Sequence, residues 1–242
     1  MRNNVKNSRD SPSLRDQHVV ILGGSSGVGY ATAKCALAEG AKVTIASNQE
    51  ARVEAALARL GPRAHGVVVD VRDEASIAAF FKGFVAFDHL LYMIADSGPH
   101  LLSASLTQRD STAAASALRN ASWGALTAIR YAQSRLSTRG SIVLTDRTRL
   151  NRSSPQSVPV RVFDHMTRSL AVDLAPLRVN AVRSYRKSTG GAVESELLQC
   201  TQGLLIPRSA EPVEIAQAYL YLLRGSYTTG QVLVVDGGRT LL

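Results

Sequence analysis

Residues 18–29 read His-Val-Val-Ile-Leu-Gly-Gly-Ser-Ser-Gly-Val-Gly, and this stretch decides the fold of the 242-residue chain. The apolar run His18–Leu22 predicts a short buried strand, and residues 27–39 have the periodicity of a helix. Four glycines, at positions 23, 24, 27 and 29, lie at the junction, where a tight turn needs residues without a side chain. The stretch therefore predicts a strand, a glycine turn and a helix in immediate succession.

The spacing of these glycines is typical of a loop that binds a dinucleotide. Gly23 permits the tight turn, Gly27 a close approach of a pyrophosphate to the backbone, and Gly29 close packing of helix on strand. The helix N-terminus adds free N–H groups and the positive end of the helix dipole. A purely structural glycine turn is the alternative. The candidate cofactor contacts here are Gly23, Ser25, Ser26, Gly27 and Val28.

Short apolar runs and amphipathic stretches alternate along the rest of the chain. We expect seven strands, at His18–Leu22, Lys42–Ala46, Gly66–Val69, His89–Ile94, Ser141–Thr145, Arg178–Val182 and Gln231–Val235, and helices near 27–39, 49–60, 74–84, 107–136, 162–174 and 212–224. This alternation predicts an α/β fold with a doubly wound, seven-stranded parallel sheet in one Rossmann domain over residues 14–242. Residues 1–13 are polar and without periodicity, and are expected to form a disordered tail.

Composition and charge argue against several classes of protein. The net charge is +9, but the basic residues are dispersed and the densest stretch, Arg147–Arg152, has no aromatic residues among them. This distribution argues against nucleic acid and favours an anionic cofactor. No apolar run is long enough for a membrane span or a secretory signal. Cys35 and Cys200 lie too far apart in the sequence to form a metal cluster, so we expect no metal and a reducing compartment, the cytoplasm.

The glycine pattern GxxxGxG resembles that of the short-chain dehydrogenase/reductase family, with Leu22 in place of the family's threonine. The resemblance extends over about residues 15–242 and implies a Rossmann fold with a nicotinamide cofactor. Further motifs that carry it are the adenine-contacting pair Asp70-Val71, the segment Thr167–Val182 and the closing motif Tyr227–Gly238. Ala95 ends the segment that matches the family's NNAG, and Thr189 matches the threonine that contacts the nicotinamide carboxamide.

The end of the second strand predicts which nicotinamide cofactor binds. Selectivity for NAD usually needs an acidic residue there, which binds the ribose 2′-hydroxyl. This chain instead has Ser47 and Asn48, which can donate hydrogen bonds to a 2′-phosphate. We therefore expect NADP(H), with the phosphate held by neutral donors or by Arg52. The alternative is that Ser47 and Asn48 form only a polar strand end.

The family's proton-transfer residues are missing. Asp146 or Arg147 stands where the resemblance places the catalytic serine. The Tyr-x-x-x-Lys positions fall on Gln156 and Val160 in one register, and on Val160 and Asp164 in the other. A Tyr-x-x-x-Lys spacing does occur at Tyr30 and Lys34, but it lies in the helix after the glycine loop and is set aside.

The remaining residues favour a substrate that needs no proton. A ketone that receives hydride becomes an alkoxide and needs an acid, whereas an iminium ion becomes neutral. A carboxylate at Asp146 would stabilise such a cation, which makes Asp146 the candidate catalytic residue. The alternative is that Asp146 has no catalytic role and only forms an ion pair with Arg147 or Arg149. Some fungal relatives in the resembling family lack the tyrosine and lysine, reduce cyclic iminium intermediates of indole alkaloids, and guide a cycloaddition.

Two functions therefore remain open from the sequence. One is an NADPH-dependent reductase of an imine- or iminium-type biosynthetic intermediate, which also guides a cyclisation. The other is a catalytically inactive protein that binds NADP(H) as a sensor or structural subunit. The apolar faces of helices 107–136 and 162–174 predict a homodimer or homotetramer. The basic residues Arg147, Arg149, Arg183, Arg186 and Lys187 oppose a cationic substrate unless they face phosphates or solvent.

Overall fold

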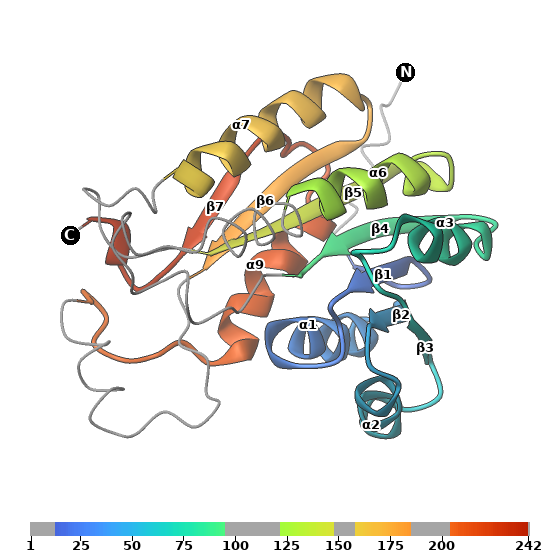
Figure 1. Ribbon diagram of the computed structural model, residues 1–242. Coiled ribbons are helices and arrows are strands. Elements are labelled where there is room, and N and C mark those ends of the chain that lie inside the picture. Colours follow the sequence, from blue (N-terminus) through green and yellow to red (C-terminus); the bar gives the residue numbers. More distant parts are fainter. Residues whose placement is uncertain (1–12, 95–121, 148–157, 185–203, 242) are drawn as a thin grey trace, which may run out of the picture.

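A computed structural model describes residues 13–94, 122–147, 158–184 and 204–241 (Figure 1). Seven parallel strands form one sheet in the order β3-β2-β1-β4-β5-β6-β7. The strands are β1 His18–Leu22, β2 Lys42–Ser47, β3 Ala64–Val68, β4 Phe87–Tyr92, β5 Leu136–Arg147, β6 Arg178–Ser184 and β7 Val232–Val235. The prediction of a single doubly wound domain is confirmed.

Helices cover both faces of the sheet (Figure 1). The helices are α1 Gly27–Ala38, α2 Glu50–Leu60, α3 Glu74–Lys82, α6 Gly124–Ala132, α7 Val158–Asp173 and α9 Pro212–Arg224, followed by the 3₁₀ turn η4 Arg239–Leu241. Apolar residues of α3, α6 and α7 form one core with the sheet, and those of α1, α2 and α9 form the other. No helix among the described residues combines the length and apolarity that a membrane crossing requires.

The central strand shows why the sheet needs two helix layers. In β1, Val20 and Leu22 belong to the core under α3 and α6, while Val19 and Ile21 belong to the core under α1 and α9. All four side chains are buried, which explains the continuous apolar run in the sequence. At the edge strand β3, by contrast, Val67 and Val68 are exposed and belong to neither core.

The predicted helix 107–136 is wrong at its end, and residues 95–121 lie outside the described part of the chain. Helix α6 ends at Ala132, and β5 begins at Leu136, five residues earlier than the predicted Ser141. Leu136 pairs with Phe87, and the register then shifts before Ser141. At Gly140 the backbone passes so close to the Asp88 carbonyl that an added Cβ would collide with it. A search for apolar runs found the later part of β5 but missed its irregular first five residues.

The strand order reverses between β1 and β4, which makes their carboxyl ends the switch point of the sheet. Parallel α/β sheets bind ligands in the crevice outside the carboxyl ends at such a point. The loops after β1, β2 and β3 lie at this edge, as do the last residues of β5 and β6, whose arrows point to the left in Figure 1. They carry most of the residues that the sequence predicts as contacts for the cofactor and substrate.

Candidate active site at the carboxyl edge of the sheet

The glycine loop has the backbone geometry that its sequence predicts. Gly23 has φ +93° and Gly27 has φ +57°, values that side-chain-bearing residues rarely adopt. The N–H groups of Gly23 and Gly24 donate to the Ala46 carbonyl oxygen at 2.8 and 3.3 Å, which ties the loop to the end of β2. A Cβ on Gly29 would collide with the Gly23 carbonyl oxygen. Glycine at Gly29 therefore allows α1 to start directly against the loop.

The N-terminus of α1 is open to an anion. Ser26 is the N-cap residue, but its side chain caps no N–H group, and the first turn contains no acidic residue. Within the described residues, the N–H groups of Gly27 and Val28 have no hydrogen-bond partner. Helix α3, by contrast, is capped: the Asp73 side chain accepts a hydrogen bond from the Ala75 N–H group in its first turn. The end of α1 therefore fits a phosphate group of a dinucleotide.

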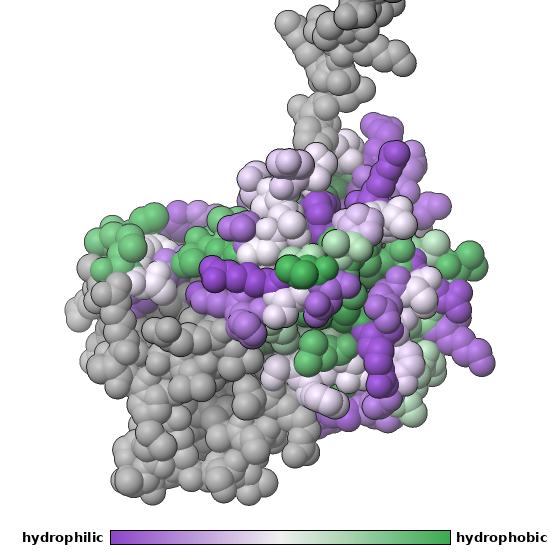
Figure 2. All heavy atoms as spheres, turned by 90° about the horizontal axis from the view of Figure 1, so that it is seen from above, coloured by the Kyte–Doolittle hydropathy of each residue, from purple (hydrophilic) through white to green (hydrophobic). Residues whose placement is uncertain are grey.

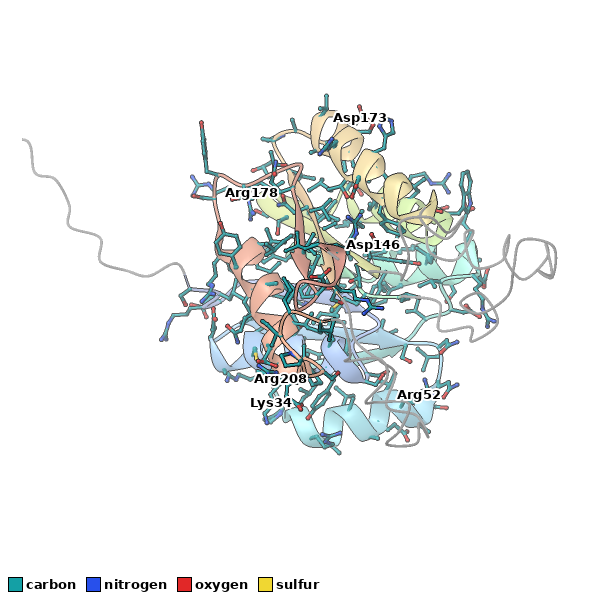
Figure 3. All side chains as sticks on the ribbon, turned by 90° about the vertical axis from the view of Figure 1, so that its left-hand side faces the viewer. Lys34, Arg52, Asp146, Asp173, Arg178 and Arg208 are labelled. Carbon is teal, nitrogen blue, oxygen red and sulfur yellow. The ribbon has the colours of Figure 1, made fainter. Side chains whose placement is uncertain are left out.

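The residues predicted to select the cofactor lie next to this loop. Ser47 is the last residue of β2 and is half-buried, while Asn48 is exposed. The hydrogen bonds to Ala46 hold the glycine loop beside both residues. The first turn of α2 then brings Glu50 and Arg52, of opposite charge; Arg52 projects from the start of α2 in Figure 3. That Ser47, Asn48 or Arg52 contacts a ribose phosphate stays a prediction.

The predicted adenine-contacting pair follows β3 at the same edge. Val71 is buried, and Asp70 is partly exposed. The Arg72 guanidinium binds the Asp70 carboxylate through two nitrogens, with Nη2 at 2.6 Å from Oδ2. These hydrogen bonds hold the pKa of Asp70 below its ordinary value. Asp70 is thus a fixed, charged acceptor at the rim of the site. The other two predicted contacts, Ala95 and Thr189, lie outside the described residues.

The candidate catalytic residue belongs to a buried charge cluster, hereafter the Arg183 cluster: Asp146, Arg183 and Asp164. Asp146 on β5 and Arg183 on β6 are register partners, and Arg183 Nε donates to Asp146 Oδ2 at 2.7 Å. Arg183 Nη2 donates to Oδ1 of Asp164, which lies on α7. Burial disfavours the Arg183 charge, but the two carboxylates outweigh it and raise its pKa. One cation is shared by two anions.

This cluster bears on two expectations. The sequence raised Arg147 or Arg149 as partners for Asp146; among the described side chains the partner is Arg183, and the side chain of Arg147 lies outside that part of the structure. Arg149 lies outside the described residues, as do Arg186 and Lys187. Arg183 was also expected to face phosphates or solvent if the substrate is a cation. Its side chain is instead only 9% exposed, and it is neutralised by carboxylates.

Sequence reasoning missed the roles of Arg183 and Asp164. The signal for Arg183 was a charged residue in a strand that is buried along its whole length, where a charge requires a nearby counter-charge. The identity of that counter-charge depends on the β5–β6 register, because the two residues are 37 positions apart. Asp164 had appeared only as one of the two candidates for the lysine position.

The described tyrosines near this edge are buried within the two cores. Tyr92 ends β4, and its hydroxyl fills the space left by the missing side chain of Gly124; burial raises its pKa. Tyr219 on α9 shares a hydrogen bond of 2.7 Å with Thr145, the residue before Asp146. Both side chains are fully buried, so neither is placed to exchange a proton readily with solvent.

Tyr30, the tyrosine of the Tyr-x-x-x-Lys spacing in α1, has a structural role. The Arg59 guanidinium of α2 lies over the Tyr30 ring, 4.4 Å from its centre. This contact joins the neighbouring helices α1 and α2. Tyr30 therefore packs between helices, as expected when the pair was set aside as a catalytic motif.

Comparison with known proteins agrees with this geometry. Residues 23–240 match the family described as enoyl-(acyl carrier protein) reductase. The chain is 29% identical to the short-chain dehydrogenase/reductase ATR9 of Stachybotrys chlorohalonatus, over 95% of this chain and 99% of that one. It is 27% identical to a small-chain dehydrogenase solved in complex with NADPH, with a TM-score of 0.77 over 94% of this chain and 100% of that one.

A further solved structure shares the fold at lower sequence identity. This is the MalC reductase/Diels–Alderase of Malbranchea aurantiaca, 24% identical, with a TM-score of 0.84 over 97% of this chain and all of that one. The likeness covers the same strands and helices that position the glycine loop and the Arg183 cluster. With the family match over residues 23–240, these findings show that the chain belongs to the short-chain dehydrogenase/reductase family and is an oxidoreductase of that type.

Proposed function

We propose that this protein is an NADPH-dependent reductase of an imine- or iminium-type biosynthetic intermediate. The observation that carries the proposal is the Arg183 cluster, which stands at the carboxyl ends of β5 and β6. Its two carboxylates and one guanidinium sum to one negative charge. A family reductase of ketones would instead have a serine, a tyrosine and a lysine at this end of the sheet. The summed charge of these three described residues is therefore the opposite of the one that favours an alkoxide.

The cofactor of this proposal is NADP(H). The uncapped start of α1 fits a pyrophosphate, and the end of β2 lacks the carboxylate that would repel a 2′-phosphate. The likeness to a dehydrogenase solved with NADPH supports the same choice. When bound, NADPH supplies the hydride, and the protein supplies position and electric field.

Within the cluster, Asp164 is the carboxylate that a bound cation would meet. The Asp146 side chain is 7% exposed and bonded to Arg183, whereas that of Asp164 is 35% exposed. Among the described residues, Oδ2 of Asp164 has no hydrogen-bond partner, since Arg183 binds Oδ1. We therefore assign contact with the substrate to Asp164. Asp146, the residue that the sequence favoured, becomes a positioning residue that holds Arg183.

With an iminium ion as the substrate, which is also the form that a protonated imine takes, the proposed chemistry needs no acid. An iminium carbon that accepts hydride turns a cationic substrate into a neutral amine, so no proton has to be delivered. The negative cluster stabilises the cation when it binds and holds it beside the cofactor. A ketone at the same place would become an alkoxide next to a carboxylate, which disfavours its reduction. Tyr92 and Tyr219 are fully buried within the two cores.

We extend the proposal to a cyclisation that follows reduction in the same site. Loss of the charge changes the electronic character of the substrate while the protein still holds its shape. The fold shared with MalC, a reductase/Diels–Alderase, supports this extension. Chiral analysis of the cyclised product tests it: an enantiomeric excess that vanishes without enzyme supports guidance, and a racemic product formed at the uncatalysed rate contradicts it.

Single-turnover hydride transfer tests the reductase proposal. NADPH oxidation is followed with a cyclic iminium and with a matched ketone, for wild type and Asp164→Asn. The control is Asp173→Asn, an exposed carboxylate on the same helix, nine residues and about 14 Å farther along. We expect Asp164→Asn to slow iminium reduction by about 10²–10³, with unchanged NADPH affinity and an unaffected control.

Three outcomes would overturn the reductase proposal. The first is rapid ketone reduction by the wild type, since the site would then contain an acid. The second is full iminium activity in Asp164→Asn. The third is tight NADPH binding without turnover of any iminium in a broad panel, which favours the inactive sensor or structural subunit instead.

A further inference from the structure

A hollow of about 490 Å³ lies at the opposite, amino edge of the sheet. It opens between the C-terminal ends of α1 and α9 and is lined by Ser13, Arg15, Glu39, Gly40, Arg63 and Arg224. The 12 residues of α1 separate it from the glycine loop by about 18 Å. The hollow is therefore distinct from the dinucleotide site.

The segment before β1 is fixed against the end of α1 and forms one wall of the hollow. Asp16 N–H donates to the Gly40 carbonyl oxygen at 3.2 Å, and the Ser13 hydroxyl donates to the Glu39 carbonyl oxygen. Gly40 has φ +91°, and a Cβ there would lie 3.3 Å from the Arg15 Cα. These contacts hold the Arg15 backbone at the rim of the hollow.

The charged groups of the hollow are only partly paired. Arg224 Nη1 contacts Glu39 Oε1 at 3.2 Å, and Arg63 Nη2 donates to the Leu37 carbonyl oxygen at 2.8 Å. Within the described residues, the Arg15 guanidinium has no hydrogen-bond or ion-pair partner. Glu39 Oε2 is buried and without a partner. The hollow thus combines three cations with one carboxylate that still needs a donor.

Helix capping explains part of this arrangement. Arg63 binds the last turn of α1, and Arg224 Nε donates to Leu220 within α9, as basic residues commonly do at helix C-termini. Capping accounts neither for the guanidinium of Arg15 nor for the buried oxygen of Glu39. A buried carboxylate oxygen without a donor is unfavourable, and a ligand hydroxyl would satisfy it.

We propose that this hollow binds a small hydroxylated anion, a phosphate or carboxylate that also carries a hydroxyl group. The anionic group would take hydrogen bonds from Arg15 and Arg63, whose planar guanidinium groups suit both phosphate and carboxylate. The Glu39 side chain, which is 25% exposed, would turn Oε2 toward the hollow and accept a hydrogen bond from the hydroxyl. Such a ligand would join the ends of α1 and α9, two helices that pack against each other, and would stabilise the folded state.

Calorimetric titration of the full chain tests the site with probes that differ by their hydroxyl groups. The probes are malate against succinate, and glycerol 3-phosphate against methyl phosphate. Saturating NADP⁺ is present throughout, because it occupies the anion-binding end of α1. We expect the hydroxylated member of at least one pair to bind about tenfold more tightly, and the better pair distinguishes a carboxylate from a phosphate ligand.

Three variants identify the groups involved. Arg15→Ala combined with Arg63→Ala should weaken the better probe by about tenfold or more, while Arg168→Ala, an exposed arginine on α7, should not. Glu39→Ala removes the acceptor, so it should remove the preference for the hydroxylated probe and tighten binding of the plain anion. Unchanged NADP⁺ affinity shows that each variant is folded. The proposal is overturned if no probe binds, if paired probes bind equally, or if the double variant binds like wild type.

Discussion

Arg183 on β6 donates its Nε–H to Oδ2 of Asp146 on β5 across 2.7 Å, and both side chains are nearly inaccessible to solvent. The two residues face each other because parallel pairing of β5 and β6 puts them in register. Two buried charges lose the solvation of water, so each depends on the other. The second contact of Arg183, with Asp164, connects this buried pair to the open end of the sheet. Arg183 therefore neutralises a buried carboxylate of the fold and also contacts Asp164, the residue proposed to meet the substrate.

The first prediction concerns the stability of this cluster. Arg183→Met should lower the free energy of unfolding by about 3–5 kcal/mol, because it leaves the Asp146 carboxylate buried without its counter-charge. Asp164→Asn should lower it by less than about 1 kcal/mol, because that pair is partly exposed. The loss in the free energy of unfolding for Asp146→Asn should lie between these two values, because Arg183 would still form its ion pair with Asp164. Urea unfolding at neutral pH measures all three, and equal losses would contradict this order.

The second prediction is a pH dependence from His89. Its ring lies between Ser141 Oγ at 2.8 Å and Gln17 Oε1 at 2.6 Å. Burial lowers the pKa of His89 from 6.5 to about 4. The unfolded chain therefore binds a proton at a higher pH than the folded protein does. The free energy of unfolding should fall as pH drops from 6.5 toward 4, by at most about 3 kcal/mol from this residue.

Urea unfolding at several pH values tests this dependence with two variants. His89→Gln should be less stable at pH 7 but should lose less stability on acidification, because its side chain does not titrate. His65→Gln removes an exposed histidine and is the matched control. The slope should flatten only in the first variant. An unchanged slope in His89→Gln would show that other groups account for the acid sensitivity.

A third prediction concerns cofactor selectivity. NADPH should bind more tightly than NADH, because β2 ends in Ser47 rather than in a carboxylate. Ser47→Asp should weaken NADPH by roughly tenfold or more and strengthen NADH, since a carboxylate repels the 2′-phosphate and accepts from the 2′-hydroxyl. Fluorescence titration with both cofactors checks it. Equal wild-type affinities for the two cofactors would refute it.

The fourth prediction is that the protein forms a homodimer or homotetramer. Trp123, directly before α6, and Val172, on α7, are 65% and 76% exposed. Figure 2 views the side of the molecule that α6 and α7 cover, where apolar groups lie between hydrophilic ones. Burial of such residues against a second copy would remove them from water. Light scattering at micromolar concentration should show an oligomer, and a monomeric wild type would count against this.

A pair of variants locates the interface. Val172→Asp should weaken the oligomer, because it places a charge in the contact. Val85→Asp changes an equally apolar and even more exposed residue, in the connection between α3 and β4, and should leave the assembly intact. Dissociation by both variants, or by neither, would place the interface elsewhere.

The elements that the sequence predicted best are those whose signals are local. Helix α9 has the predicted bounds, 212–224, because Pro212 and the capping box of Glu211 and Glu214 act within one turn. The glycine loop was predictable for the same reason. Gly23 and Gly29 permit a close contact between residues only six positions apart. The apolar run of the strand and the periodicity of the helix directly flank this loop in the sequence.

Other features depended on residues that are distant in the sequence. The start of β5 at Leu136 follows from its pairing with Phe87, and no local pattern marks it. Asp146 could be recognised as an acidic residue at the end of a strand, but its partner could not. Arg183 meets it only when β5 and β6 align, and Asp164 joins only when α7 packs over them. The sequence by itself thus determined the α/β sheet and its dinucleotide loop, because short-range periodicity and backbone freedom encode them. Only the tertiary structure decided which charges neutralise one another, because electrostatic pairing depends on distance in space.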